Sequence, residues 1–143
     1  MIAFQTSITI ERPIDEVFAY VADPGNFPSW NSAVQIVRPT SPSGGVGSTY
    51  VMERRLPTGR ATNQLEIVVC DPSREFAIRT IDGLTPFLYR YRFAAEGDDT
   101  VVRLDAQVEA PGLAALMPQL AQRAVKQGVD DNLTTLKLIL EDL

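Results

Sequence analysis

The stretch IAFQTSITIERPIDEVFAYVADP, residues 2–24, carries the clearest structural signal in the chain. Over residues 2–11 apolar and polar side chains alternate, which is typical of a strand with one buried face. Pro13 then suits the first turn of a helix, and Asp15 and Glu16 follow near the positive end of the helix dipole. The stretch therefore predicts a lone strand that runs directly into a short amphipathic helix.

The chain after this opening is divided by short turns. Residues 23–26, Asp-Pro-Gly-Asn, end the first helix, and a second short helix or a pair of turns carries Phe27 and Trp30. Six further strands are expected at about 33–39, 46–56, 59–70, 75–82, 85–95 and 100–109. Because most of the breaks between them are short, we expect hairpins and an antiparallel meander. No internal repeat or linker divides the chain, so we expect one domain over residues 1–143.

The final segment, from about Leu113 to Leu143, has the period of a long amphipathic helix. Its expected apolar face comprises Leu113, Leu116, Met117, Leu120, Ala124, Gly128, Asn132, Leu136, Ile139 and Leu140. Pro118 should kink this helix or separate a first turn from its main body. The part after Pro118 would span roughly 35–40 Å, which is enough to cross a sheet.

Side-chain parity predicts the register of the meander. If each hairpin loop has an even number of residues, the same parity class faces inward on both sides of every turn. Turns centred on 57–58, 72–73, 83–84 and 97–98 give the opposed pairs Met52–Asn63, Tyr50–Leu65, Val69–Phe76, Ile67–Ile78, Thr80–Phe87, Ile78–Tyr89, Phe76–Tyr91, Phe93–Val102, Tyr91–Leu104 and Tyr89–Ala106. Nearly all are apolar or aromatic, whereas the opposite parity collects charged residues, so we expect these pairs to face inward. One bulge would reverse the faces of the strands beyond it.

The inner face also carries polar residues, namely Tyr50, Arg54, Asn63, Thr80, Tyr89 and Tyr91. Buried polar groups need partners, which a ligand or water would supply. A few polar groups in an apolar, aromatic cleft are typical of a small-molecule site. The candidate ligand-binding residues that should line such a cavity are Trp30, Tyr50, Met52, Arg54, Asn63, Phe76, Ile78, Tyr89, Tyr91, Met117, Leu120, Ala124 and Gly128.

Several of these candidates have a structural interpretation beside the functional one. Trp30 either caps one end of the sheet or forms a wall at the mouth of the pocket. Tyr89 and Tyr91 are either core aromatics or hydroxyl donors to a ligand carbonyl. Asn63 either binds a ligand or is paired with backbone or water.

The remaining candidates also have both a structural and a functional interpretation. Arg54 either binds a carboxylate at the edge of the pocket or is a solvated arginine at a hairpin tip. Gly128 inside a helix allows either close contact with the sheet or room for a ligand. Met52 and Met117 either fill space or line a deformable pocket.

The composition excludes several classes of function. Of 143 residues, 45% are hydrophobic and 22% are charged, and the net charge is −5. This acidic balance argues against nucleic-acid binding and against docking on an anionic membrane. No apolar run approaches the roughly 20 residues of a membrane span, and the N-terminus lacks the features of a signal peptide, so we expect a cytoplasmic protein without membrane insertion.

The residues that usually carry catalysis are scarce. The chain has no His and one Cys, Cys70. This excludes a Ser–His pair and argues against a zinc site. No Gly-rich loop joins a strand to a helix, so the motifs that cradle phosphates are missing. We therefore predict no catalytic residue, no metal and no cofactor.

A likeness to a known superfamily rests on both ends of the chain. Residues 8–24, ITIERPIDEVFAYVADP, and FPSW at 27–30 resemble the opening of START-like (SRPBCC) proteins, a superfamily that includes the birch pollen allergen. The tail, NLTTLK at 132–137 followed by Glu141, resembles its closing helix. The nearest branch is the polyketide cyclase/dehydrase and lipid-transport group, and the likeness covers essentially the whole chain.

This resemblance implies an α+β helix-grip fold. In that fold a seven-stranded antiparallel sheet wraps around the long C-terminal helix, with two short helices between strands 1 and 2. Members bind lipids, hormones, polyketides or other hydrophobic ligands between sheet and helix, and some are cyclases. The group has no universal catalytic motif, so no catalytic residue carries over.

Three functions remain open at this point. The first is binding or transport of a small hydrophobic ligand, such as a lipid, polyketide or isoprenoid-like molecule, which the inward aromatic face and the scarcity of catalytic groups favour. The second is a polyketide cyclase or dehydratase that uses interior Tyr and Asn groups. The third is a protein-interaction or chaperone co-factor role. The residues leave open whether the protein is a monomer or a homodimer.

Overall fold

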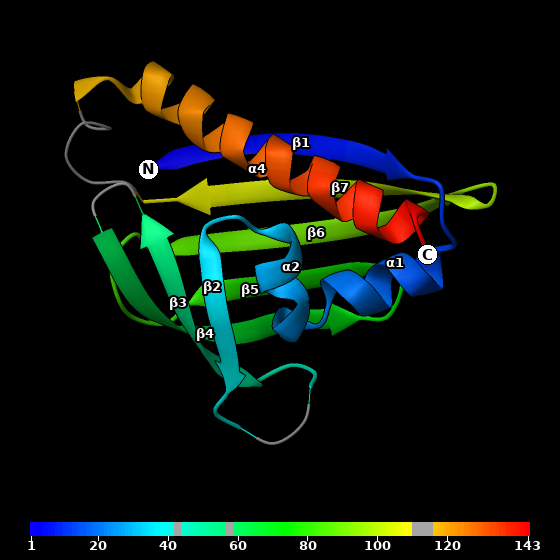
Figure 1. The fold of residues 1–143 in the computed structure, drawn as a ribbon, viewed down its shortest axis with the longest axis horizontal. Helices are drawn as coiled ribbons and strands as arrows, with labels where there is room; N and C mark the ends of the chain where they lie inside the picture. The colour runs from blue at the N-terminus through cyan, green and yellow to red at the C-terminus, as the bar shows by residue number, and fades with distance from the viewer. Residues whose placement is uncertain (42–43, 57–58, 110–115) are drawn as a thin grey trace.

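The computed structural model describes residues 1–41, 44–56, 59–109 and 116–143. It contains one antiparallel sheet, a long helix across its face and short helices at one end (Figure 1). In chain order the elements are β1 (Ile2–Ile10), α1 (Ile14–Val21), the 3-10 turn η1 (Pro24–Asn26), α2 (Phe27–Trp30), β2 (Val34–Pro39), β3 (Thr49–Leu56), β4 (Gly59–Asp71), β5 (Glu75–Thr80), β6 (Phe87–Glu96), β7 (Asp99–Val108) and α4 (Pro118–Glu141).

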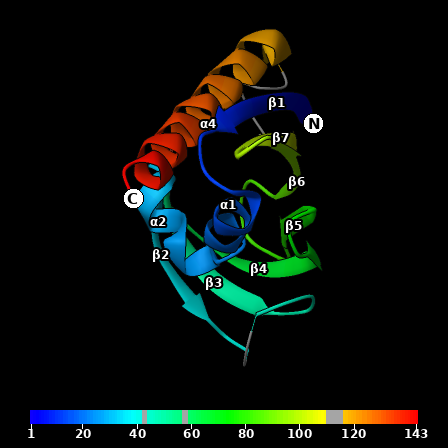
Figure 2. The same ribbon diagram turned by 90° about the vertical axis from the view of Figure 1, so that its right-hand side faces the viewer.

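The seven strands form one sheet in the order β1-β7-β6-β5-β4-β3-β2. β2 to β7 follow one another as a meander, and β1 joins the far side of β7. Figure 2 shows the sheet as an arc, with α4 spanning its open side and α1 and α2 at one end. The expected helix-grip fold, with two short helices between the first two strands, is confirmed.

The register of most hairpins follows the parity argument. Met52 lies opposite Asn63, and Ile78 lies opposite Tyr89. The pairs predicted between β6 and β7 are also confirmed. The backbone N–H of Phe87 donates to the Thr80 hydroxyl. The inner face was therefore predictable because the side-chain period of a strand is two.

The β4–β5 hairpin departs from the prediction twice. The register shifts between Ile67 and Val69, so Val69 pairs with Ala77 instead of Phe76. The loop between these strands has three residues, 72–74, because Asp71 and Glu75 still pair. The bulge places one extra residue in β4, and the loop is one residue longer than the predicted two-residue loop. Two extra residues preserve the side-chain parity, so the later strands keep the predicted inner face.

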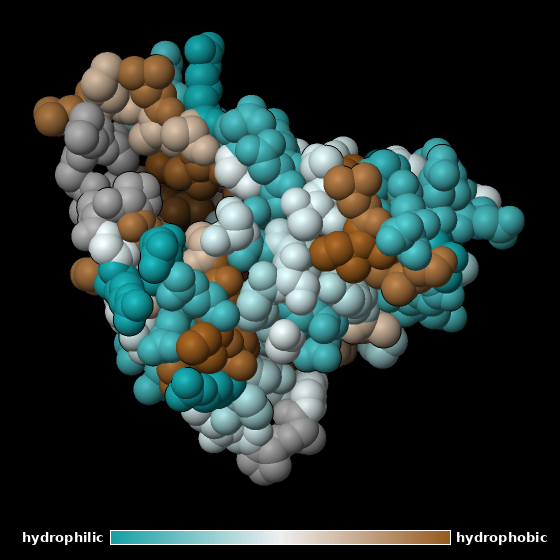
Figure 3. All heavy atoms as spheres, in the orientation of Figure 1, coloured by the Kyte–Doolittle hydropathy of each residue, from teal (hydrophilic) through white to brown (hydrophobic). Residues whose placement is uncertain are grey.

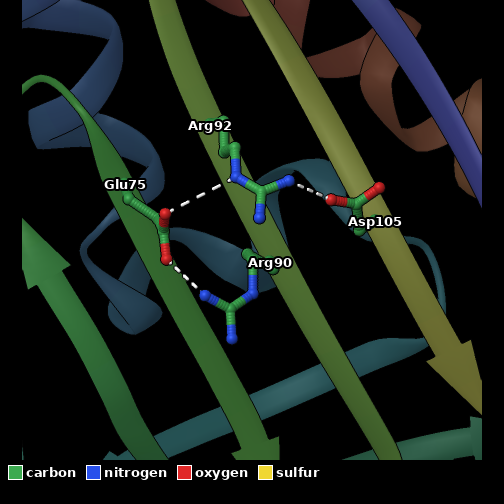
Figure 4. Close-up of polar contacts among 4 residues, drawn as sticks. All are labelled: Glu75, Arg90, Arg92 and Asp105. Carbon is green, nitrogen blue, oxygen red and sulfur yellow. Dashed lines mark hydrogen bonds and ion pairs between the residues drawn. The ribbon is translucent and has the colours of Figure 1, made fainter.

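The outer face of the sheet carries a network of ion pairs across β5, β6 and β7 (Figure 4). Arg90 Nη1 lies 2.5 Å from Glu75 Oε2, and Arg92 Nε lies 3.5 Å from Glu75 Oε1. Arg92 also pairs with Asp105. These groups are partly exposed, so each pair stabilises the fold by about 1 kcal/mol or less. Their position agrees with the predicted outward parity.

The helix α4 begins at Pro118, which stands at its first position and does not kink it. The prediction for Leu113 lies outside the described residues. Hydrogen bonds tie the helix to β1 and to the residue after it: Thr6 Oγ1 to Asp130 Oδ1 (2.5 Å), Lys137 Nζ to Thr9 O (2.6 Å) and Glu11 N to Glu141 Oε2 (2.8 Å).

The apolar face predicted for this helix is only partly correct. Leu116, Met117 and Leu120 are large apolar residues, yet they are 82%, 47% and 55% exposed. The buried residues of α4 are Val129, Leu133, Leu136 and Leu140. The physical reason is the curvature of the sheet, because the C-terminal half of α4 packs on the core while the N-terminal half stands over a hollow.

Candidate functional site

A cavity of about 300 Å³ lies between the concave face of the sheet and the N-terminal half of α4. Figure 3 shows a hollow with hydrophobic walls beside the first turns of this helix. Its walls come from α2 and residues 31–34 after it, from β3, β5, β6 and β7, and from α4. Sheet curvature creates the space, because the helix crosses the arc as a straight rod and cannot follow its concave face.

Eight of the thirteen candidate residues lie in the walls of this cavity. They are Trp30, Met52, Arg54, Ile78, Tyr89, Tyr91, Ala124 and Gly128. They converge from five different elements, which only the folded sheet brings together.

Five candidates lie elsewhere, for three physical reasons. Tyr50 borders a separate depression beside Pro39. Phe76 is fully buried behind the wall, where its ring stacks on Tyr91 at 6.2 Å between centroids. Asn63 is also fully buried and binds Arg54. The other two, Met117 and Leu120, are exposed to solvent.

The sequence argument missed other wall residues. They are Phe27, Asn31, Ser32, Ala33, Val34, Leu56, Thr85, Phe87, Val108, Val125, Val129 and Asn132. Parity had already turned Phe87 inward, so that signal was available. Residues 31–33 and Thr85 belong to connections, where no periodic pattern points to the cavity.

Aromatic rings form a continuous part of the wall. Trp30 meets Phe27 and Tyr91 edge-on, with centroids 5.7 and 6.3 Å apart. Tyr91 meets Tyr89, and Tyr89 stacks on Phe87 at 4.6 Å. The indole Nε1 of Trp30 is buried and has no hydrogen-bond partner among the described residues. A buried donor without a partner is costly, so this N–H makes the site less stable than a fully paired one would be.

The two tyrosine hydroxyls stay protonated at neutral pH. Burial raises the pKa of Tyr89 to about 12, although the positive charge of Arg54 acts in the opposite direction. Burial, with a smaller contribution from Tyr89, also raises the pKa of Tyr91. Neither hydroxyl makes a hydrogen bond within the described part of the chain. Both can therefore donate to a carbonyl or carboxylate oxygen.

Arg54 is 8% exposed and lies in the wall of the cavity. Its Nε and Nη2 donate to Asn63 Oδ1 at 3.0 and 2.6 Å. Nη2 also donates to the carbonyl oxygens of Leu84 (2.9 Å) and Thr85 (3.1 Å). The guanidinium carbon lies 5.3 Å from the centroid of the Phe87 ring. Arg54 is thus a buried cation, and the hypothesis of a solvated hairpin tip is wrong.

The loop after β5 is held against β4 by Asn63. Its Nδ2 donates to the carbonyl oxygens of Asp82 (2.8 Å) and Leu84 (3.0 Å). Gly83 has φ +92°, and a Cβ there would lie 2.4 Å from Asn63 Nδ2. Only glycine fits this close approach in the left-handed region. The sequence argument left a backbone partner open for Asn63, and the structure shows one.

The described residues hold no group of three or more His, Cys, Asp or Glu side chains that could bind a metal ion. Among the same residues, no helix is both long and apolar enough to cross a membrane.

Comparison with solved structures shows the fold. TTHA0849 from Thermus thermophilus superposes with a TM-score of 0.80 at 16% identity, covering 94% of each chain. A START superfamily protein from Mycobacterium smegmatis has a TM-score of 0.78 at 12% identity, covering 98% of this chain and 97% of that one. The Zhui aromatase/cyclase from Streptomyces sp. R1128 has a TM-score of 0.76 at 14% identity, covering 97% and 93%.

The family follows from the sequence itself. A search of the curated proteins found no match. The sequence model of the family described as polyketide cyclase/dehydrase and lipid transport matches residues 1–141, nearly the whole chain. The chain therefore belongs to the polyketide cyclase/dehydrase and lipid-transport family, as its two ends had suggested.

Proposed function

We propose that the protein binds a small, largely hydrophobic molecule in this cavity and acts as its carrier or sensor. The observation that carries the proposal is an apolar cavity of about 300 Å³ with Tyr89 and Tyr91 in its walls, whose hydroxyls make no hydrogen bond within the described residues. Pockets for small molecules occupy roughly 300–1,000 Å³ and combine apolar walls with a few polar groups. Membership of a family described as lipid transport supports the same class of role.

The scarcity of catalytic groups supports binding over catalysis. The chain has no His. The wall residues that the structure describes include no Asp and no Glu. The groups that remain, tyrosine hydroxyls, an indole N–H and a guanidinium, are hydrogen-bond donors at neutral pH. Such a set orients a ligand through its oxygen atoms.

Ligand titration tests this proposal directly. Trp30 is the only tryptophan and lies in the wall, so its fluorescence reports on occupancy. Fatty acids, aromatic polyketides and isoprenoids would be titrated in turn, and native mass spectrometry would give the stoichiometry. We expect one-to-one binding of at least one class. Failure of every class to bind in both assays would contradict the proposal.

A pair of variants locates the binding site. Gly128 lies in the wall, and apart from its two chain neighbours and the nearby helix backbone no described atom lies within 4 Å of the place where its Cβ would be. Gly128→Phe should fill part of the cavity and weaken binding about tenfold or more. Gln122→Phe, at an exposed position of the same helix outside the wall, is the matched control and should bind normally. Equal binding by both variants would place the ligand elsewhere.

A second candidate function is cyclisation or dehydration of a polyketide. One observation favours it: a protonated Tyr89 hydroxyl and the Arg54 cation share one wall, where they could stabilise an enolate oxygen. The Zhui aromatase/cyclase has the same fold. Against this, the described residues of the wall offer no carboxylate as a base.

Turnover of a poly-β-keto thioester, corrected for spontaneous cyclisation, separates the two candidates. On the catalytic hypothesis Tyr89→Phe should lower the rate at least tenfold and leave the fold intact. A rate equal to the spontaneous one in the wild-type protein would remove this candidate for that substrate.

A further inference from the structure

The charge inside the cavity is of one sign. Among the wall residues that the structure describes, Arg54 is the only one that carries a full charge at neutral pH. Arginine stays protonated in proteins, although burial lowers the pKa of this guanidinium. The cavity is therefore an apolar space with one fixed positive charge in its wall.

No carboxylate neutralises this charge in the described part of the chain. The hydrogen-bond acceptors of Arg54 are the amide oxygen of Asn63 and the backbone oxygens of Leu84 and Thr85. The ion pairs found among residues 1–41, 44–56, 59–109 and 116–143 join partly exposed side chains, and none of them includes Arg54. A buried cation with only neutral partners is unfavourable unless an anion joins it.

The guanidinium also has N–H groups that make no hydrogen bond within the described residues. Nε and Nη2 make all of its hydrogen bonds, so the two N–H groups of Nη1 have no partner in the described residues. Nη1 is not fully buried, and Arg54 lies in the wall of the cavity. A neutral side chain would serve to hold the loop, whereas the spare N–H pair suits an incoming anion.

We propose that the ligand of this cavity is an organic acid, with a hydrophobic skeleton in the apolar space and a carboxylate against Arg54. Tyr89, whose ring stacks on Phe87 beside the guanidinium, supplies a second donor to the same oxygen atoms. A single cation matches a singly charged carboxylate better than a doubly charged phosphate. This inference rests on the proposed binding function and names its ligand class.

Matched ligands test the inference in the wild-type protein. Decanoate, decan-1-ol and methyl decanoate share one apolar chain and differ in the head group. Titrations followed by Trp30 fluorescence at about pH 7.5 should show decanoate binding about tenfold or more tightly than either neutral compound, as expected for one charge-assisted hydrogen bond. The same comparison with 2-naphthoate and 2-naphthalenemethanol, followed by calorimetry, extends the test to an aromatic skeleton.

Two variants at one position separate charge from structure. Arg54→Gln and Arg54→Lys both disturb the hydrogen bonds to Asn63, but only the lysine variant keeps the positive charge. We expect Arg54→Gln to bind decanoate and decan-1-ol within about threefold of each other, and Arg54→Lys to retain most of the preference for the acid. Circular dichroism and thermal melting would show that each variant folds.

The outcomes distinguish the two proposals. Equal binding of acid and alcohol by the wild-type protein would overturn the carboxylate inference and leave the hydrophobic-ligand function standing. An acid preference that persists in a folded Arg54→Gln variant would also overturn it. Binding of none of these compounds, nor of the wider panel, would contradict the proposed function as well.

Discussion

The two halves of α4 meet the same curved sheet in different ways. In the C-terminal half, Leu133, Leu136 and Leu140 are buried against the core. In the N-terminal half, Leu120 is exposed, and Ala124, Val125 and Gly128 border a cavity. Hydrogen bonds to β1 and Glu11 fasten the helix at Asp130 and beyond.

This difference separates the part of the helix that packs on the core from the part that borders the cavity. The packed half contributes apolar burial, which is the main favourable term in folding. The half over the cavity contributes a small residue at Gly128 and leaves space unfilled. Around that space the structure is held by polar contacts of Arg54 and Asn63. Substitutions in the two halves should therefore change the free energy of unfolding by different amounts.

The largest effect is expected in the packed half. Leu136→Ala should lower the free energy of unfolding by about 2–5 kcal/mol, because it removes a fully buried side chain and leaves a void. Leu120→Ala, at an exposed position of the other half, should change it by about 0.5 kcal/mol or less. Urea unfolding measures both, and equal losses would remove the distinction between the halves.

The next effect is expected where polar contacts replace packing. Asn63→Ala should destabilise the fold by about 1–3 kcal/mol, because the buried Arg54 loses its amide acceptor and the loop after β5 loses two hydrogen bonds. The neighbouring Gln64→Ala, whose side chain lies on the exposed face, is the control and should be nearly neutral. An Asn63→Ala protein as stable as the control would show that this network does not hold the loop.

A smaller effect of opposite sign is expected over the cavity. Gly128→Ala should stabilise the protein by about 1 kcal/mol, because glycine is a poor helix former. A Cβ at this position meets no described atom within 4 Å beyond its two chain neighbours and the nearby helix backbone. Thermal unfolding monitored by circular dichroism measures the change. A loss of stability would mean that the helix and sheet are in close contact there, contrary to the cavity.

The smallest effect concerns the link between the two halves at Asp130. Burial alone would raise the pKa of this carboxyl, but hydrogen bonds from Lys126 and Thr6 and the charge of Lys126 lower it below its ordinary value of 3.8. The folded state thus binds the proton less readily than the unfolded state, so the contribution is present above about pH 4 and is lost as the pH falls through the folded pKa. Asp130→Asn should cost about 0.5 kcal/mol at neutral pH.

The check on this prediction is the pH dependence of unfolding. The difference in stability between the wild-type protein and Asp130→Asn should shrink as the pH falls below about 4. A difference that stays constant down to about pH 2 would show that the carboxylate charge has no part in fastening the helix.

Much of the fold was predictable because periodicity reports directly on buried faces. The wrong prediction that Val69 pairs with Phe76 shows a feature that periodicity does not report. Residues 67–70, Ile-Val-Val-Cys, are all apolar, so nothing in their pattern marks the extra residue of a bulge. The inner face survived because the three-residue loop that follows adds a second extra residue.

The cavity was less predictable than the sheet. An apolar stripe on a helix shows which side is apolar, but the curvature of the sheet decides which part of the stripe meets the core. Leu116 and Leu120 were therefore placed inside wrongly. Two acceptors of Arg54, the carbonyl oxygens of Leu84 and Thr85, lie in the loop after β5. The path of this loop depends on Gly83 and Asn63 and not on any repeating pattern.

The form of β2 has a consequence for association between molecules. This strand is one edge of the sheet, its register shifts between Val34 and Ile36, and it ends in Pro39, which has no backbone N–H. A regular exposed edge invites another chain to add a strand, whereas a short, irregular edge that ends in proline is a poor template. The protein can thus keep an open-sided sheet around its cavity and still resist edge-to-edge aggregation.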